Sequence, residues 1–132
     1  MPSNRDANGY VILDRTACLQ RLALQRVASL AITEHALPVV LPVLYTLDDE
    51  DIVVGAASTG VLGRRLPGNV VSLCVHDVAD DLLSGWTVTV TGRAVPVAES
   101  TDLRRWAADN SRQVVVRIGT ERISGRQILR TE

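Results

Sequence analysis

The segment Gly85–Ala98 constrains the fold more than any other part of the chain, because its side chains alternate with a period of two. Trp86, Val88 and Val90 fall on one face of an extended chain, and three threonines fall on the other. After Gly92 the apolar residues move to positions of the opposite parity. Such a change at a glycine predicts a bulge or a barrel corner, where the strand bends to close a sheet.

The composition predicts that strands also supply the core. Aromatic residues make up 3% of the 132 residues and phenylalanine is absent, so valine, leucine, isoleucine and alanine must fill the interior. Valine-rich interiors favour strands. A hydrophobic share of 46% and a charged share of 22% are typical of a globular protein. We expect a single domain over residues 14–132, preceded by a loosely held N-terminal arm over residues 1–13.

Further patterns complete the fold prediction. Asp14 is placed to cap a helix that extends to Arg26, because Cys18, Leu19 and Leu22 share one helical face. Strands are expected at residues 27–32, 37–47, 52–57, 69–75, 85–98 and from 114 to beyond 122, with an acidic loop at 76–83 and a short helix at Asp102–Ala108. Six strands without βαβ alternation predict an antiparallel barrel or sandwich.

The predicted strand Leu37–Leu47 is apolar on both faces, whereas an antiparallel strand usually shows one face to water. Burial on both sides needs an additional surface, and a second copy of the chain is one source of it. We therefore expect a homodimer. The alternative is that the N-terminal helix covers the outer side of this strand.

Charge and motif spacing argue against several classes of protein. The net charge is −1 and no run exceeds two basic neighbours, which argues against nucleic-acid binding. No stretch reaches the roughly 18 apolar residues of a membrane span and the N-terminus lacks a signal-peptide pattern, so we expect a cytoplasmic protein. Asp48–Asp51 is interpreted as a hairpin turn rather than as a metal site. Cys18 and Cys74 are expected to be reduced core thiols.

The order of these segments resembles the small flavin-binding split β-barrels related to pyridoxamine phosphate oxidase. The most specific pieces are GWTVTVTGRA at Gly85–Ala94 and VRIGTERISGR at Val116–Arg126, and the similarity covers nearly everything after Asp14. The resemblance implies a mainly β, Greek-key-like split barrel of about six antiparallel strands with an N-terminal helix and short interrupting helices.

The same resemblance implies a homodimer that binds a cofactor at the subunit interface and transfers hydride. The cofactor would be FMN or, in some branches of the family, a deazaflavin coenzyme or haem. The residues implied beside the ribityl phosphate are Ala56, Ala57, Ser58, Thr59, Gly60, Leu62, Arg64 and Arg65. Those implied around the ring are Pro42, Val43, Leu44 and Tyr45, with Trp86 approaching from the neighbouring subunit. No residue is an obvious acid–base catalyst.

The chain departs from the family where a flavin phosphate would be held. It has Ala56 and Ala57 where members of the family commonly have an Arg-Thr pair. It has Leu62 where the family has a lysine that reaches the phosphate. A charged hydrogen bond to phosphate is worth roughly 1.5–3 kcal/mol, so losing two could weaken binding by about two to four powers of ten. Arg64 and Arg65 could compensate, or they could form the solvated face of a short helix.

Three functions therefore stay open. The first is a flavin- or deazaflavin-dependent oxidoreductase. The second is a protein that binds a nucleotide cofactor or haem without turnover, and the third is a dimeric interaction module whose cofactor site has collapsed. A polar, arginine-lined cavity at the interface would favour the first two functions, whereas a cavity filled by Leu44 and Leu62 would favour the third.

Overall fold

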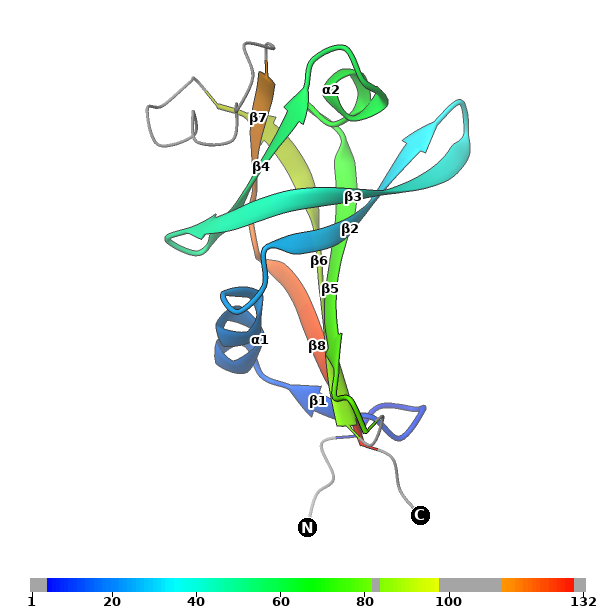
Figure 1. Cartoon of the computed structure of the whole chain (residues 1–132), viewed down its shortest axis with the longest axis vertical. Helices are drawn as coiled ribbons and strands as arrows, with labels where there is room; N and C mark the ends of the chain where they lie inside the picture. Colours follow the sequence, from blue (N-terminus) through cyan, green and yellow to red (C-terminus); the bar gives the residue numbers. More distant parts are fainter. Residues whose placement is uncertain (1–4, 82–83, 98–112, 130–132) are drawn as a thin grey trace.

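A computed structural model of the chain describes residues 5–81, 84–97 and 113–129 (Figure 1). Strands dominate the described part. The elements are β1 (Val11–Leu13), α1 (Arg15–Leu22), β2 (Val27–Glu34), β3 (Leu37–Asp48), β4 (Asp51–Ala57), α2 (Val61–Arg65), β5 (Val70–Val78), β6 (Ser84–Pro96), β7 (Gln113–Ile118) and β8 (Arg122–Leu129). The helix expected at Asp102–Ala108 lies outside the described residues.

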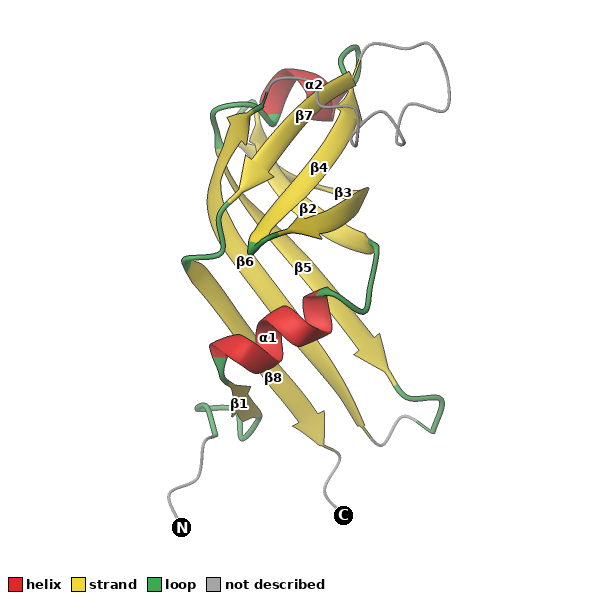
Figure 2. Ribbon diagram, turned by 90° about the vertical axis from the view of Figure 1, so that its left-hand side faces the viewer, coloured by secondary structure: helices red, strands yellow, loops and turns green. Residues whose placement is uncertain are grey.

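The strands form a closed antiparallel barrel with an open extension. Their order is β1-β8-β6-β5-β2-β3-β4-β7, and an additional pairing between β6 and β7 closes the ring of β6, β5, β2, β3, β4 and β7. Strands β8 and β1 continue the sheet outward from β6, and α1 lies across one face of this extension (Figure 2). The predicted mainly β split barrel is therefore confirmed.

Strand β6 turns the barrel corner at Gly92. It pairs with β8 as far as Thr91 and with β7 from Ala94 onward. A Cβ atom on Gly92 would lie 3.2 Å from the Gly119 carbonyl oxygen, so glycine permits this close approach. The expected corner is present, but the expected change of parity is wrong: Ala94 continues the buried face, and Val95 is 51% exposed. The strand bends without reversing its faces.

Among the described residues the interior is mainly aliphatic, as the composition predicted, and it includes one fully buried tyrosine. The largest fully buried side chains are Tyr45, Leu22, Leu30, Ile52, Leu66, Leu73, Ile118, Val54, Val71, Val75, Val88 and Val90. The Tyr45 hydroxyl donates to the Leu22 carbonyl oxygen at 2.6 Å, which satisfies a polar group inside the core. Burial raises the pKa of Tyr45 to about 12. This contact ties the end of α1 to the barrel wall.

Helix α1 is shorter than expected, although its start is confirmed. The Asp14 carboxylate accepts from the Ala17 amide at 2.8 Å and caps the helix. At the other end, the Leu24 amide bonds to the Arg21 carbonyl, which tightens the last turn. The Arg26 carbonyl then accepts from the Tyr45 amide at 2.9 Å. This sheet contact draws the chain out of the helix before Arg26.

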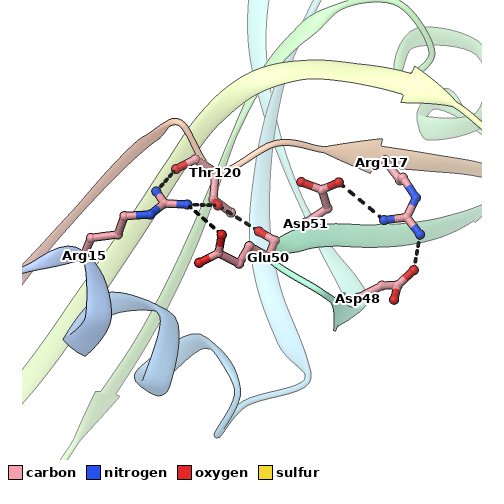
Figure 3. Close-up of polar contacts among 6 residues, drawn as sticks. All are labelled: Arg15, Asp48, Glu50, Asp51, Arg117 and Thr120. Carbon is pink, nitrogen blue, oxygen red and sulfur yellow. Dashed lines mark hydrogen bonds and ion pairs between the residues drawn. The ribbon is translucent and has the colours of Figure 1, made fainter.

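A buried threonine fixes the connection between β7 and β8 (Figure 3). Thr120 is 2% exposed, and its hydroxyl donates to the Glu50 carbonyl at 2.8 Å and accepts from Arg15 at 2.9 Å. Arg15 also donates to the Thr120 carbonyl. These contacts turn the chain at residues 119–121. The last strand, expected to continue past Arg122 without a break, is therefore two strands.

The acidic segment Asp48–Asp51 forms the β3–β4 hairpin, as the sequence predicted. Asp48 and Asp51 both pair with Arg117 of β7 (Figure 3), and Asp49 takes a φ of 58° in the turn. Within the described ranges, no group of three or more histidine, cysteine or acidic side chains is arranged to hold a metal ion. In the same part of the chain, no helix has the length and apolarity to cross a membrane.

Two other segments are more ordered than we expected. The described part of the N-terminal arm joins the sheet, because β1 pairs with β8 and the Asp6 carboxylate accepts from Arg126. Strand β5 extends to Val78, so His76–Val78 belongs to a strand instead of the expected acidic loop. The long pairing with β6 supplies the hydrogen bonds that stabilise this extension.

The β2–β3 turn provides a test of backbone strain. His35 and Ala36 have φ of 50° and 65°, as a two-residue type I′ turn requires, and alanine tolerates that region poorly. We expect Ala36→Gly to raise the free energy of unfolding by about 1 kcal/mol. Denaturant titration would measure this change in the free energy of unfolding. Ala31→Gly, in the middle of β2, should instead lower stability by roughly 0.5–1 kcal/mol, and a loss in Ala36→Gly would contradict the turn assignment.

The buried tyrosine provides a test at alkaline pH. The pKa of Tyr45 is about 12 in the folded state and close to 10 when unfolded, so the unfolded state loses its proton first. The free energy of unfolding should therefore fall as pH rises from 10 to 12, and it should fall less in Tyr45→Phe. All 14 basic residues are arginine, so no lysine titrates in this window. An equal decline in Tyr45→Phe and the wild type would contradict this role of Tyr45.

Candidate functional site

The segment that follows β4 folds into a tight turn and a short helix. The Gly60 amide donates to the Ala57 carbonyl at 3.2 Å, and α2 then packs against the end of β4. A Cβ atom on Gly63 would lie 2.2 Å from the Ala57 oxygen and 2.6 Å from Ser58 Cα. Only glycine allows this approach. The helix therefore lies directly on the backbone of the preceding turn.

The two arginines of α2 have different surroundings. Arg64 donates to the Thr59 carbonyl at 3.0 Å, and its other terminal nitrogen lies 3.8 Å from the Glu34 carboxylate. Arg65 is half-buried, and the described part of the chain offers its guanidinium no hydrogen-bond or ion-pair partner. Both arginines lie on a short helix, as expected by the interpretation that they form the face of such a helix. Of the two, Arg65 is the cation left to receive an anion.

At the three positions where the family has an Arg-Thr pair and a lysine, two of the side chains of this chain lie toward the core. Ala56 is 8% exposed, and Leu62 packs against the hydrophobic cluster. Ala57, Thr59 and Gly60 are exposed, and Ser58 is half-buried. The outward surface of this turn therefore consists of backbone, a methyl group and hydroxyls.

The implied ring-binding segment divides between the two faces of β3. Pro42 and Leu44 point outward and are exposed, whereas Val43 and Tyr45 are 5% and 1% exposed and lie inside the barrel. The Tyr45 hydroxyl already bonds to the Leu22 carbonyl. Val43 and Tyr45 therefore offer their backbone, and Pro42 and Leu44 their side chains, to a ligand on the outer side of β3, because a strand sends alternate side chains to opposite faces.

Trp86 lies far from α2 within one protomer. It stands near the start of β6, opposite Asp77 of β5 and Gln127 of β8, at the end of the molecule away from α2 (Figure 1). Its side chain is half-buried and packs against the core cluster. One protomer therefore does not bring Trp86 to the α2 turn.

A broad face of short side chains escaped the sequence analysis. The strand register aligns residues from five strands on the outer side of the sheet, and none of them is buried. One row is Val40, Ala31, Ser72, Thr91 and Arg122, and the next is Pro42, Ser29, Cys74, Thr89 and Ser124, across β3, β2, β5, β6 and β8. We call these ten residues the outer face. The signal was present as small residues at alternate positions, but only the register joins them.

The outer face corrects two expectations. Cys18 and Cys74 are both free, but only Cys18 is buried, whereas Cys74 is half-buried on the outer face. The alternative in which the N-terminal helix covers the outer side of β3 is wrong. Helix α1 packs on β8 and β6, and Val40 and Leu44 of β3 are 64% and 54% exposed.

Comparisons with known proteins agree with this architecture. A family model described as pyridoxamine 5'-phosphate oxidase matches residues 14–127. No curated protein sequence matches the chain significantly. Among solved structures, the FAD binding protein from Mycobacterium smegmatis is similar with a TM-score of 0.74 and 20% identity, over 90% of this chain and 98% of that chain.

Two further structures share the fold. An FAD-binding protein from Mesorhizobium loti has a TM-score of 0.74 and 21% identity, over 90% of this chain and 98% of that chain. The FAD and haem binding protein from Mycobacterium smegmatis has a TM-score of 0.68 and 14% identity, over 86% of this chain and 70% of that chain. Because the family model spans most of the sequence and these split barrels share its architecture, the chain belongs to the pyridoxamine 5'-phosphate oxidase family.

Proposed function

We propose that the protein is a homodimeric flavin-dependent oxidoreductase that holds its cofactor between the two copies. The observation that carries the proposal is the separation of the implied cofactor residues within one protomer. Trp86 lies at one end of the molecule and α2 at the other, so a second copy is needed to bring the two together (Figure 1). The outer face offers that copy a place to bind.

The outer face and the strand ends beside it support association. Val40, Leu44 and neighbouring Val27 are 64%, 54% and 58% exposed, although they sit on central strands of the barrel. Short serine, threonine and alanine side chains beside them would let a second sheet approach closely. A contiguous exposed patch of this kind is typical of a protein–protein contact, and a self-complementary contact gives a closed dimer.

The residues fit a flavin in part. Pro42 and Leu44 present apolar surface for the ring system, Arg65 presents a cation for a phosphate, and Thr59 at the preceding turn presents an exposed hydroxyl. The charged partners absent at positions 56, 57 and 62 make this phosphate contact weaker than the family's usual one. The names of three structural neighbours include FAD. We therefore propose FAD or FMN as the cofactor, with a deazaflavin as the alternative.

The bound flavin would supply the chemistry by accepting or donating hydride, and the protein would supply binding and orientation. In the described part of the chain, His35 and His76 are exposed. Pro42 and Leu44 would exclude water from one side of the ring, and the partner subunit's Trp86 would do so from the other. The two free cysteines agree with a reducing compartment, so we keep the cytoplasm in the proposal.

A second function has one observation in its favour. The chain lacks the family's charged phosphate contacts, an arginine of the Arg-Thr pair and a lysine, because it has Ala56, Ala57 and Leu62 there. Such a site could hold a flavin or haem without turning over a substrate. Anaerobic mixing of the flavin-bound protein with NADH and NADPH separates the two functions. Bleaching of the flavin absorbance within seconds would support an oxidoreductase, and an unchanged spectrum with both donors would support a carrier.

The dimer can be tested on the exposed part of β3. We expect Leu44→Glu to raise the dimer dissociation constant by at least about thirtyfold, because it places a charge in a desolvated contact. Sedimentation velocity at several concentrations measures this change. The protomer fold should survive, since Leu44 is 54% exposed. Val95→Glu, a matched control at 51% exposure beyond the barrel corner, should leave association unchanged. A wild-type monomer at micromolar concentration would contradict the dimer.

Flavin binding can be tested through Arg65. The purified protein should show a flavin spectrum or bind FAD saturably in a fluorescence titration. Arg65→Ala should weaken FAD binding by roughly 10- to 100-fold, the usual worth of one charged hydrogen bond to phosphate. Arg21→Ala removes the same charge from α1 and should leave the affinity unchanged. Equal losses in both variants would mean that net charge, rather than a contact from Arg65, governs binding.

A further inference from the structure

Glu34 lies beside Arg64, the residue that precedes the proposed phosphate contact Arg65 in α2. It is the last residue of β2, and its side chain is only 19% exposed. Its carboxylate oxygen lies 3.8 Å from the Arg64 guanidinium, whose other terminal nitrogen donates to the Thr59 carbonyl at 3.0 Å. His35 approaches the same carboxylate at 3.9 Å. The ion pair with Arg64 therefore places the acid next to the α2 turn.

This arrangement changes the charge that the turn offers to an anion. Positions 56, 57 and 62 are uncharged, so the cations of the segment are Arg64 and Arg65. Glu34 lies 3.8 Å from the Arg64 guanidinium and offsets its charge, so the pair contributes no net charge and Arg65 supplies the positive charge of the segment. A phosphate near Arg65 therefore gains little from Arg64, and the attraction that Glu34 cancels grows with the charge of the phosphate.

We propose that Glu34 is a specificity-determining residue that selects FAD over FMN at this site. The inference rests on the proposed function, which sets the flavin phosphate beside α2. The terminal phosphate of FMN is a monoester with a charge near −2 at neutral pH, whereas each phosphate of FAD is a diester with a charge of −1. The carboxylate of Glu34 opposes the monoester more strongly because the two negative charges fall on a single phosphate. Riboflavin, which has no phosphate, is not affected.

The test is Glu34→Gln, titrated with FMN, FAD and riboflavin at moderate salt. We expect the affinity for FMN to rise about tenfold, equivalent to about 1.4 kcal/mol, and the affinity for FAD to rise about threefold, with riboflavin unchanged. The gain for FMN should disappear in the double variant Glu34→Gln/Arg64→Ala. The single substitution frees Arg64 from its ion pair with Glu34, and the double variant no longer contains that arginine. Glu121→Gln is the matched control, since it removes the same charge from the exposed β7–β8 connection.

The outcomes separate the two proposals. If all three ligands bind and Glu34→Gln changes none of the affinities, or raises them equally, Glu34 does not determine specificity, although the flavin site stands. If neither the wild type nor the variant binds any of the three, the flavin proposal and this inference both fail. Glu121→Gln reproducing the gain for FMN would also overturn the inference, because total charge would then explain it. Thermal unfolding of each variant confirms that the fold is intact.

Discussion

Strand β6 belongs to both parts of the molecule, and the rest of the architecture depends on that sharing. Residues Gly85–Arg93 of this strand pair with β5 along one edge, while the other edge pairs with β8 as far as Thr91 and with β7 from Ala94 onward. Barrel closure and the open extension therefore use the same backbone. A Cβ atom at Gly92 would lie 3.2 Å from the Gly119 carbonyl oxygen, which is closer than an ordinary contact, so glycine favours the corner. The register of β6 also decides which residues of β5 and β8 lie beside it on the outer face.

Local pattern predicted those elements whose hydrogen bonds are local. The alternation around Val88 and Val90, the Asp14 cap and the acidic β3–β4 hairpin depend on neighbours in sequence, and all three are confirmed. The local pattern did not predict features that depend on contacts between residues distant in the sequence. Thr120 breaks the last strand because Arg15 and the Glu50 carbonyl bind it, at separations of 105 and 70 residues. No window of sequence contains such a contact.

The candidate site shows the same division. Periodicity could suggest that Val43 and Tyr45 point away from Pro42 and Leu44, but the family resemblance grouped all four, and the structure separates them by face. The two arginines of α2 look equivalent in sequence. They differ because Glu34, at the end of another strand, lies beside Arg64, whereas the described residues give the Arg65 guanidinium no partner. A sequence names the cations of a site, whereas the fold decides which of them a ligand meets.

We propose that each flavin site is built from two copies of the chain. A crystal structure of the protein grown with FAD tests this most directly. We expect one FAD per protomer at the contact between two outer faces. Its phosphates would lie against α2 of one copy, its ring against Leu44, and the partner subunit's Trp86 within contact distance. An FAD bound wholly within one protomer, or a crystal in which the outer face contacts only solvent, would contradict it.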